Sequence, residues 1–197
     1  MKEIEKLKSF FKDNKIDGYI IPKNDEFFNE YISENKDNLK FISKFSGSYG
    51  FALILKNVNY LFVDGRYTLQ AKIQSGKFFK VITIPKTLPS DILKNKRITI
   101  GYDPKLHTHN SIKYLFRNCD CNLLSLKENL IDKIWLKKNN NNLKKFYKLK
   151  NKFTGQSSEN KVKSILKILN KNKTNYQFIS ASENVAWLLN IRGSDSE

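Results

Sequence analysis

Cysteine is scarce in this sequence, and long apolar runs are missing. The 197 residues include two cysteines, Cys119 and Cys121, separated by a single residue. This spacing excludes the disulfide framework that stabilises small secreted domains and fits reduced cytosolic thiols. No apolar run approaches the ~20 residues that a membrane-spanning helix needs, and residues 1–6 are charged where a secretory signal would be apolar. These absences predict a cytoplasmic protein that neither spans nor binds a membrane.

Acidic residues are also in the minority, with 19 Asp and Glu against 36 Lys and Arg and a formal net charge of +17. Clustered positive charge favours nucleic acid as a partner. The excess, however, is mostly lysine and is spread along the whole chain. Arginine is preferred for bidentate contacts to phosphate or guanine, and no recognition motif for DNA or RNA is present. We therefore expect no specific nucleic-acid partner, and keep a basic module that contacts an acidic partner as an alternative function.

Helical and strand-like patterns alternate along the first two thirds of the chain. Residues 51–55 and 60–63 are apolar and flank a turn, which predicts a hairpin. Further strands are predicted at 18–22, 79–84, 97–102 and 121–124, and helices at 4–11, 24–33, 68–73, 91–93, 108–117 and 129–135. This order predicts an α/β fold with a mixed sheet and flanking helices.

A polar run of low complexity, residues 137–142, predicts a linker between a first domain at 1–136 and a second at 143–197. The second domain begins like the first. Val162, Ile165, Leu166 and Leu169 form a helical stripe, 176–179 is a predicted strand, and 180–183 has the capping-box spacing that starts a helix. An internal repeat and the ordinary helix–strand order of α/β proteins both explain this pattern. A repeat would make the second domain incomplete, because its first helix would lack strands to cover.

Four segments of the chain carry a family resemblance. They resemble, in order and at similar spacing, segments of the long three-domain form of Xaa-Pro aminopeptidase (aminopeptidase P). The segments are 45–50 (FSGSYG), 64–71 (DGRYTLQA), 127–135 (KENLIDKIW) and 186–195 (AWLLNIRGSD). The resemblance covers essentially the whole chain. It implies a creatinase/prolidase N-terminal domain up to about residue 136, followed by the truncated beginning of a second domain of similar fold.

The resemblance also implies that the catalytic machinery lies elsewhere. Members of this family cleave the bond before a proline at the second position. They use a two-metal site, usually manganese, in a C-terminal pita-bread domain whose ligands are two Asp, one His and two Glu. Two such metals bridge and activate a hydroxide while polarising the scissile carbonyl. Asp195 and Glu197 fall in the second-domain motif and are not carried over as ligands. We therefore expect no catalytic residue, no metal site and no activity in this chain alone.

One substrate-binding residue is implied by the resemblance. In the family, the arginine of the Asp-Gly-Arg-Tyr motif reaches toward the catalytic pocket and helps to hold the peptide, and the matching residue is Arg66. From the residues alone, the favoured interpretation of this stretch is a tight turn followed by an exposed residue in the first turn of a helix, and the substrate role rests on the resemblance. The partners that we expect are a separately encoded or missing catalytic domain, the peptide substrate bound through it, and a second copy in a homodimer.

A zinc site is the other metal hypothesis. His107, His109, Cys119 and Cys121 are four candidate ligands close in sequence. Both pairs have one-residue separations that differ from the usual zinc-finger spacings, and Thr108 is a predicted helix cap. We expect no zinc here.

The remaining candidates are serines and tryptophans. Ser46, Ser48 and Ser194 lie in glycine-containing turns that lack the spacing of a nucleophile elbow, so no catalytic triad is expected. Trp135 and Trp187 are expected to be core or interface anchors. Trp187, Leu188, Leu189 and Ile191 are apolar residues that strands of a complete domain should cover. We therefore expect this segment to be mobile, sticky or docked on the first domain.

Overall fold

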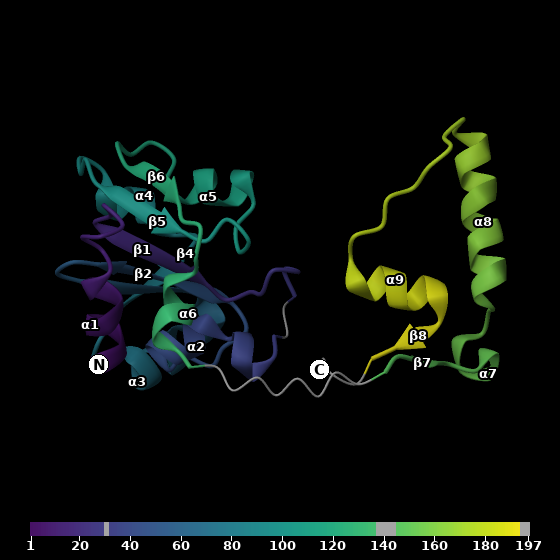
Figure 1. Cartoon of the computed structure of the whole chain (residues 1–197), viewed down its shortest axis with the longest axis horizontal. Coiled ribbons are helices and arrows are strands. Elements are labelled where there is room, and N and C mark those ends of the chain that lie inside the picture. Colours follow the sequence, from purple (N-terminus) through teal and green to yellow (C-terminus); the bar gives the residue numbers. More distant parts are fainter. Residues whose placement is uncertain (30–31, 137–144, 194–197) are drawn as a thin grey trace. The chain divides into compact units, whose positions relative to one another are not determined.

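The computed structural model describes residues 1–29, 32–136 and 145–193 (Figure 1). The chain divides into two compact units, Met1–Asn139 and Asn140–Glu197. The linker predicted at 137–142 lies outside the described residues. Each unit has its own secondary structure.

The first unit is built on a mixed sheet. Within its described residues, six strands pair in the order β4-β3-β2-β1-β5-β6. Strand β2 is antiparallel to both of its neighbours, and every other neighbouring pair is parallel. The strands are β1 (Gly18–Pro22), β2 (Gly50–Leu55), β3 (Asn59–Asp64), β4 (Lys80–Ile84), β5 (Thr99–Tyr102) and β6 (Asn122–Ser125). The predicted α/β fold with a mixed sheet is confirmed, and so is the hairpin of β2 and β3.

Helices cover both faces of this sheet (Figure 1). On one face, α1, α2, α3 and α6 pack over Tyr19 and Ile21 of β1, whereas α4 and α5 pack over Ile20 on the other. The central strands are therefore apolar along their whole length, as expected for a sheet that is buried on both faces. The helices are α1 (Lys2–Ser9), η1 (Glu34–Lys36), α2 (Asn38–Ser43), η2 (Gly65–Tyr67), α3 (Thr68–Ser75), α4 (Pro89–Leu93), α5 (His109–Leu115) and α6 (Leu130–Ile134).

The helix predicted at 24–33 is wrong for the described part of that segment. The Asp25 carboxylate accepts the backbone N–H groups of Phe27 (3.0 Å) and Asn29 (3.1 Å), and Phe28 has a φ of 60°. Such a local side-chain turn competes with helix formation for the same backbone groups. Helix α2 begins later, where the side chain of Asp37 accepts the N–H of Lys40 (2.9 Å).

The second unit contains α7 (Asn151–Thr154), α8 (Ser158–Lys171), α9 (Ser182–Leu189) and an antiparallel pair of short strands, β7 (Tyr147–Lys148) and β8 (Ile191–Arg192). The helical stripe predicted at 162–169 is confirmed as part of α8. The strand predicted at 176–179 is wrong, because this segment is neither helix nor strand. The predicted capping box is also wrong, since Ala181 is the N-cap of α9 and has no side-chain hydrogen bond. None of the described helices is both long and apolar enough to traverse a membrane.

A buried lysine joins the two main helices of this unit. The Nζ of Lys161, on α8, donates to the carbonyl oxygen of Trp187 (2.7 Å) and to Oδ1 of Asn190 (2.6 Å). It also lies 4.2 Å from the centre of the Trp187 ring. The Nδ2 of Asn190 in turn donates to the carbonyl oxygen of Gln156 (2.9 Å). The C-terminal end of α9 is thereby held by α8 and by the loop that precedes α8.

Candidate functional site at the end of strand β3

Arg66 lies on the short η2 turn directly after β3. Its Nη2 donates to Oδ2 of Asp64 (2.6 Å), its Nε lies 3.2 Å from each carboxylate oxygen, and its backbone N–H donates to Oδ1 (2.9 Å). These hydrogen bonds from Arg66 lower the pKa of Asp64 below its ordinary value. The guanidinium also lies over the ring of Tyr67, 5.2 Å from its centre. The side chain is nevertheless 71% exposed, so Asp64 orients it while leaving it accessible.

The loop at 46–49 packs against this turn. The hydroxyl groups of Ser48 and Tyr67 lie 2.9 Å apart, and the rings of Phe45 and Tyr67 meet edge to face at 5.7 Å. Gly47 lies between them, where a Cβ atom would come within 2.3 Å of the Phe45 ring and 2.9 Å of the Tyr67 ring. Two of the segments that carry the family resemblance, 45–50 and 64–71, therefore form a single structure that only glycine at 47 permits.

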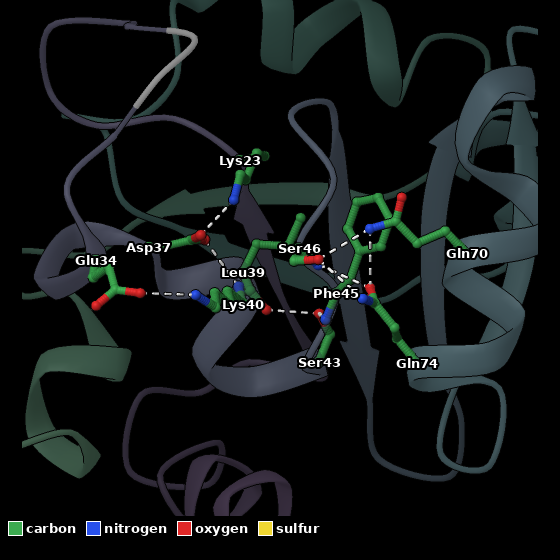
Figure 2. A network of polar contacts seen from close by, with 10 residues as sticks. All are labelled: Lys23, Glu34, Asp37, Leu39, Lys40, Ser43, Phe45, Ser46, Gln70 and Gln74. Atoms are coloured by element: carbon green, nitrogen blue, oxygen red, sulfur yellow. Dashed lines mark hydrogen bonds and ion pairs between the residues drawn. The ribbon is translucent and has the colours of Figure 1, made fainter. Parts of the chain in front are cut away.

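The same loop is tied to helix α3, as Figure 2 shows. Gln70 and Gln74 each donate through Nε2 to Oγ of Ser46 (2.9 Å each), and the backbone N–H of Ser46 donates to Oε1 of Gln74 (3.0 Å). The two glutamines are four residues apart and so share one side of α3. The sequence alone does not identify them as part of this site. Their spacing indicates a common face, but nothing in the sequence identifies Ser46 as their partner.

A buried ion pair supports the loop from the side of β1 (Figure 2). Lys23 donates through Nζ to Oδ2 of Asp37, and both side chains are buried. The backbone N–H of Lys23 donates to the carbonyl oxygen of Gly50 (2.9 Å). Lys23 thus connects the capping residue of α2 to the start of β2, where the loop ends.

This arrangement places an oriented guanidinium at the C-terminal end of strand β3. Arginine can donate to a carboxylate or to a peptide carbonyl through more than one N–H, which Lys cannot do in a fixed plane. Arg66 can therefore bind and orient an acceptor. It can neither attack a bond nor exchange a proton at neutral pH, because its guanidinium stays protonated.

The four candidate zinc ligands fall into two separate places. His107 follows the C-terminal end of β5 and is buried, with its ring beside Tyr102, and burial lowers its pKa to about 4. Cys119 and Cys121 precede β6, which is parallel to β5. They therefore lie near the N-terminal ends of these two strands, whereas His107 follows the C-terminal end of β5. Thr108 caps α5 as predicted, by accepting the N–H of Ser111 (3.1 Å). Across the described residues, no group of three or more His, Cys, Asp and Glu side chains is placed to hold a metal ion.

The candidate serines and tryptophans that the structure describes make contacts that stabilise the fold. Ser46 and Ser48 are engaged in the loop contacts described above, and Ser194, Asp195 and Glu197 lie outside the described residues. Trp135 stacks on Phe41 at 4.6 Å and packs against the core of the first unit. Trp187 packs on Lys161 but remains half exposed.

Two family models match the chain, at residues 3–134 and 137–197, and both describe a creatinase/prolidase N-terminal domain. Among curated proteins, Xaa-Pro aminopeptidase 1 of Dictyostelium discoideum is 34% identical over 98% of this chain, and the match covers 34% of that protein. A probable Xaa-Pro aminopeptidase P of Laccaria bicolor is 32% identical over 98% of this chain, and the match covers 32% of that protein. The chain therefore spans about a third of the length of these relatives.

Solved structures agree with these matches. The X-prolyl aminopeptidase of Caenorhabditis elegans, described as a cytosolic enzyme with a di-nuclear active site, matches 99% of this chain with a TM-score of 0.85 and 27% identity, over 35% of its own length. The N-terminal domain of PepQ from Mycobacterium tuberculosis matches 68% of this chain with a TM-score of 0.53 and 19% identity, which shows a common fold. The expected resemblance to Xaa-Pro aminopeptidases is confirmed, and the chain belongs to the creatinase/prolidase N-terminal domain family.

Proposed function

We propose that this chain serves as the non-catalytic N-terminal part of a dinuclear-metal Xaa-Pro aminopeptidase and is inactive alone. Its role is to present Arg66 to the peptide substrate. The observation that carries the proposal is the geometry of Arg66, whose guanidinium is oriented by Asp64 and remains 71% exposed. The relatives that the chain matches are named as Xaa-Pro aminopeptidases.

In this role, Arg66 donates hydrogen bonds to a carboxylate or carbonyl oxygen of the peptide, and Asp64 keeps the guanidinium in the required orientation. An oriented donor loses little conformational freedom when the substrate binds, so more of the interaction energy is retained as affinity. The described residues do not fit a dinuclear metal centre. The proposal therefore assigns binding and orientation to this chain, and bond cleavage to a catalytic domain that carries both metal ions.

The proposal has consequences for partners and location. A catalytic domain, on a separate polypeptide or in a longer chain, completes the peptidase, and the assembly acts in the cytoplasm, either as a single unit or as a homodimer. The cytosolic C. elegans structure supports this location.

A chimera tests the proposal. In Dictyostelium Xaa-Pro aminopeptidase 1, the part that this chain matches is replaced by residues 1–197, and cleavage of peptides with proline at the second position is measured. We expect the chimera to cleave these peptides and the isolated chain not to do so. Arg66→Ala in the chimera should lower kcat/KM by about 10- to 150-fold, which corresponds to about 1.5–3 kcal/mol for a hydrogen bond to a charged group.

Arg97→Ala is the matched control, because Arg97 is also exposed but lies before the N-terminal end of β5, whereas Arg66 follows the C-terminal end of β3. An active chimera whose kcat/KM is the same with Arg66→Ala and Arg97→Ala would remove the substrate role. Cleavage by the isolated chain would refute the non-catalytic assignment. Salt-sensitive binding of the chain to acidic polymer, without an active chimera, would favour the basic interaction module instead.

A further inference from the structure

Two cysteines lie together where the chain turns from α5 into β6. The turn includes Asn118, whose φ of 60° is a value that asparagine adopts more readily than most residues. Cys119 and Cys121 follow, and both side chains pack against the apolar cluster that contains Ile100 and Phe116. The turn therefore brings the two thiols to the same side of the chain.

Each thiol has a defined place in this turn. The Sγ of Cys119 donates to the carbonyl oxygen of Phe116 (3.1 Å), and the Sγ of Cys121 donates to the carbonyl oxygen of Lys96 (3.6 Å). A hydrogen bond also joins the two thiols, and both cysteines are partly exposed. The two sulfur atoms are thus close to each other and within reach of solvent.

The surroundings make the two thiols unequal. Burial, followed by the hydrogen bond with Cys119, raises the pKa of Cys121 to about 12, and the negative charge of Asp120 acts in the same direction. Cys121 therefore keeps its proton at neutral pH. Because the thiolate is the nucleophilic form of a cysteine, Cys119 is the sulfur that reacts first.

An open hollow of about 460 Å³ lies beside the pair. Its lining includes Ile98 and Asp120. Asp120 is the residue between the two cysteines, and the backbone N–H of Ile98 donates to the sulfur of Cys121. A small polar oxidant can therefore approach the sulfur atoms from this side.

We propose that Cys119 and Cys121 form a reversible oxidation site, at which hydrogen peroxide produces an intramolecular disulfide that a thiol reductant opens again. The inference does not depend on the proposed function. It also agrees with the reduced state that a cytosolic environment favours, where the disulfides that do form are mostly transient.

The oxidation consists of two balanced steps. The Cys119 thiolate attacks one oxygen of the peroxide, so that an S–O bond forms, the O–O bond breaks and hydroxide leaves, which takes up a proton. Cys121 then gives up its proton and attacks the sulfur of Cys119. The S–S bond forms, the S–O bond breaks, and a second hydroxide leaves and is protonated. In total, two thiols and one peroxide give one disulfide and two water molecules.

A structural bridge is the alternative role for this pair, and the spacing disfavours it. The stabilisation that a disulfide provides rises with the length of the loop that it closes. A bridge between Cys119 and Cys121 encloses a single residue. Strained or exposed disulfides are also the ones that are reduced most readily. The pair is therefore better suited to a bond that forms and breaks than to one that holds the fold together.

Intact mass measurement of the full chain tests the proposal, after reduction and treatment with an equimolar amount of peroxide. The sequence contains no third cysteine, so each thiol product is assigned directly. We expect a monomer that is lighter by two hydrogen atoms, and dithiothreitol should restore the original mass. In Cys121→Ser, the reaction should stop at the sulfenic acid, which dimedone traps, and further peroxide should convert it to the sulfinic acid.

The two single-cysteine variants are matched controls for each other. In the folded chain at neutral pH, Cys121→Ser should react with peroxide about tenfold or more faster than Cys119→Ser, because the remaining Cys121 is mostly protonated. In urea the two rates should be nearly equal, since both thiols then lose their surroundings. This comparison separates a site built by the fold from a property of any Cys-Asp-Cys sequence.

Several results would overturn the oxidation site. These are a disulfide-linked dimer as the main product, oxidation of the wild-type chain to the sulfinic acid without a disulfide, equal rates for the two folded variants, and a rate ratio that persists in urea. The chimera assay for Arg66 uses no oxidant and measures a different part of the first unit, so either proposal can fail without the other.

Discussion

Replacing Lys161 by methionine should unfold the second unit and leave the first folded. Methionine keeps the apolar length of the lysine side chain and removes only the ammonium group. That group is the donor to the Trp187 carbonyl oxygen and to Oδ1 of Asn190, both at hydrogen-bond distance. Lys161→Met therefore leaves these two acceptors without their charged donor in the interior of a small unit.

The size of the effect follows from these contacts. Each hydrogen bond to a charged group contributes about 1.5–3 kcal/mol, and the contact of the ammonium with the Trp187 ring adds about 0.5–2 kcal/mol. Burying an ammonium costs several kcal/mol, which offsets part of the sum. We expect a net loss of about 2–4 kcal/mol in the free energy of unfolding of the second unit. A unit this small has little stability to lose.

Tryptophan fluorescence during urea denaturation is the assay. The described residues place Trp135 in the first unit and Trp187 in the second. In a Trp135→Phe background, the signal reports on the second unit alone. Lys163→Met is the matched control, because Lys163 is an exposed lysine on the same helix. Equal transitions for Lys161→Met and Lys163→Met would refute the reasoning, since an exposed lysine contributes little.

Two further predictions concern the first unit. Lys23→Met should lower its free energy of unfolding by about 3–5 kcal/mol, because the Asp37 carboxylate stays buried without its partner. Lys36→Met, which breaks an exposed pair, should cost less than about 1 kcal/mol in the same urea titration, and similar losses would contradict this account. Burial lowers the pKa of His107 from 6.5 to about 4, so the unfolded chain takes up the proton first as the pH falls. Stability should therefore decline between pH 6.5 and pH 4 by up to about 3 kcal/mol, and a His107→Gln variant with an unchanged decline would show that other groups cause it.

The sequence predicts an element well where the burial of that element is complete. Residues 51–55 are apolar without interruption, and β2 is buried along its whole length between two neighbouring strands. The pattern fails at 24–29, where the apolar spacing of Phe27 and Phe28 resembles a helix but the carboxylate of Asp25 binds the backbone in a turn. Hydrophobic periodicity does not register such a local side-chain contact.

The failure at 176–179 has a different cause. The amino-acid pattern of these residues is typical of a strand, but a strand requires hydrogen-bonding partners from other segments, and the described residues of the second unit provide none for it. The strand at 59–64, by contrast, pairs with β2, which ends only a few residues earlier in the sequence. Local propensity thus identifies a candidate strand, whereas pairing depends on the rest of the fold.

The candidate site could be predicted in part. The motif at 64–67 directs attention to Arg66, and its turn geometry agrees with the simple interpretation of the sequence, an exposed residue after Asp-Gly. The substrate role remains a prediction. The contacts that build the site join residues far apart in sequence, such as Ser46 with Gln74 and Lys23 with Asp37, and no local pattern specifies them.

The position of β1 between β2 and β5 also determines the order in which its two edges can pair during synthesis. Gly18 pairs with Leu55 on one edge of β1 and with Ile100 on the other. At about 5–20 residues per second, a ribosome that has completed β3 at Asp64 needs about 2–7 s to reach Ile100 in β5. Throughout that interval, the hairpin of β2 and β3 can pair with one edge of β1 in the nascent chain, while the other edge of β1 has no partner until β5 is synthesised. This open edge is a target for chaperones and for aggregation, and its lifetime is set by the rate of translation and not by the rate of strand pairing.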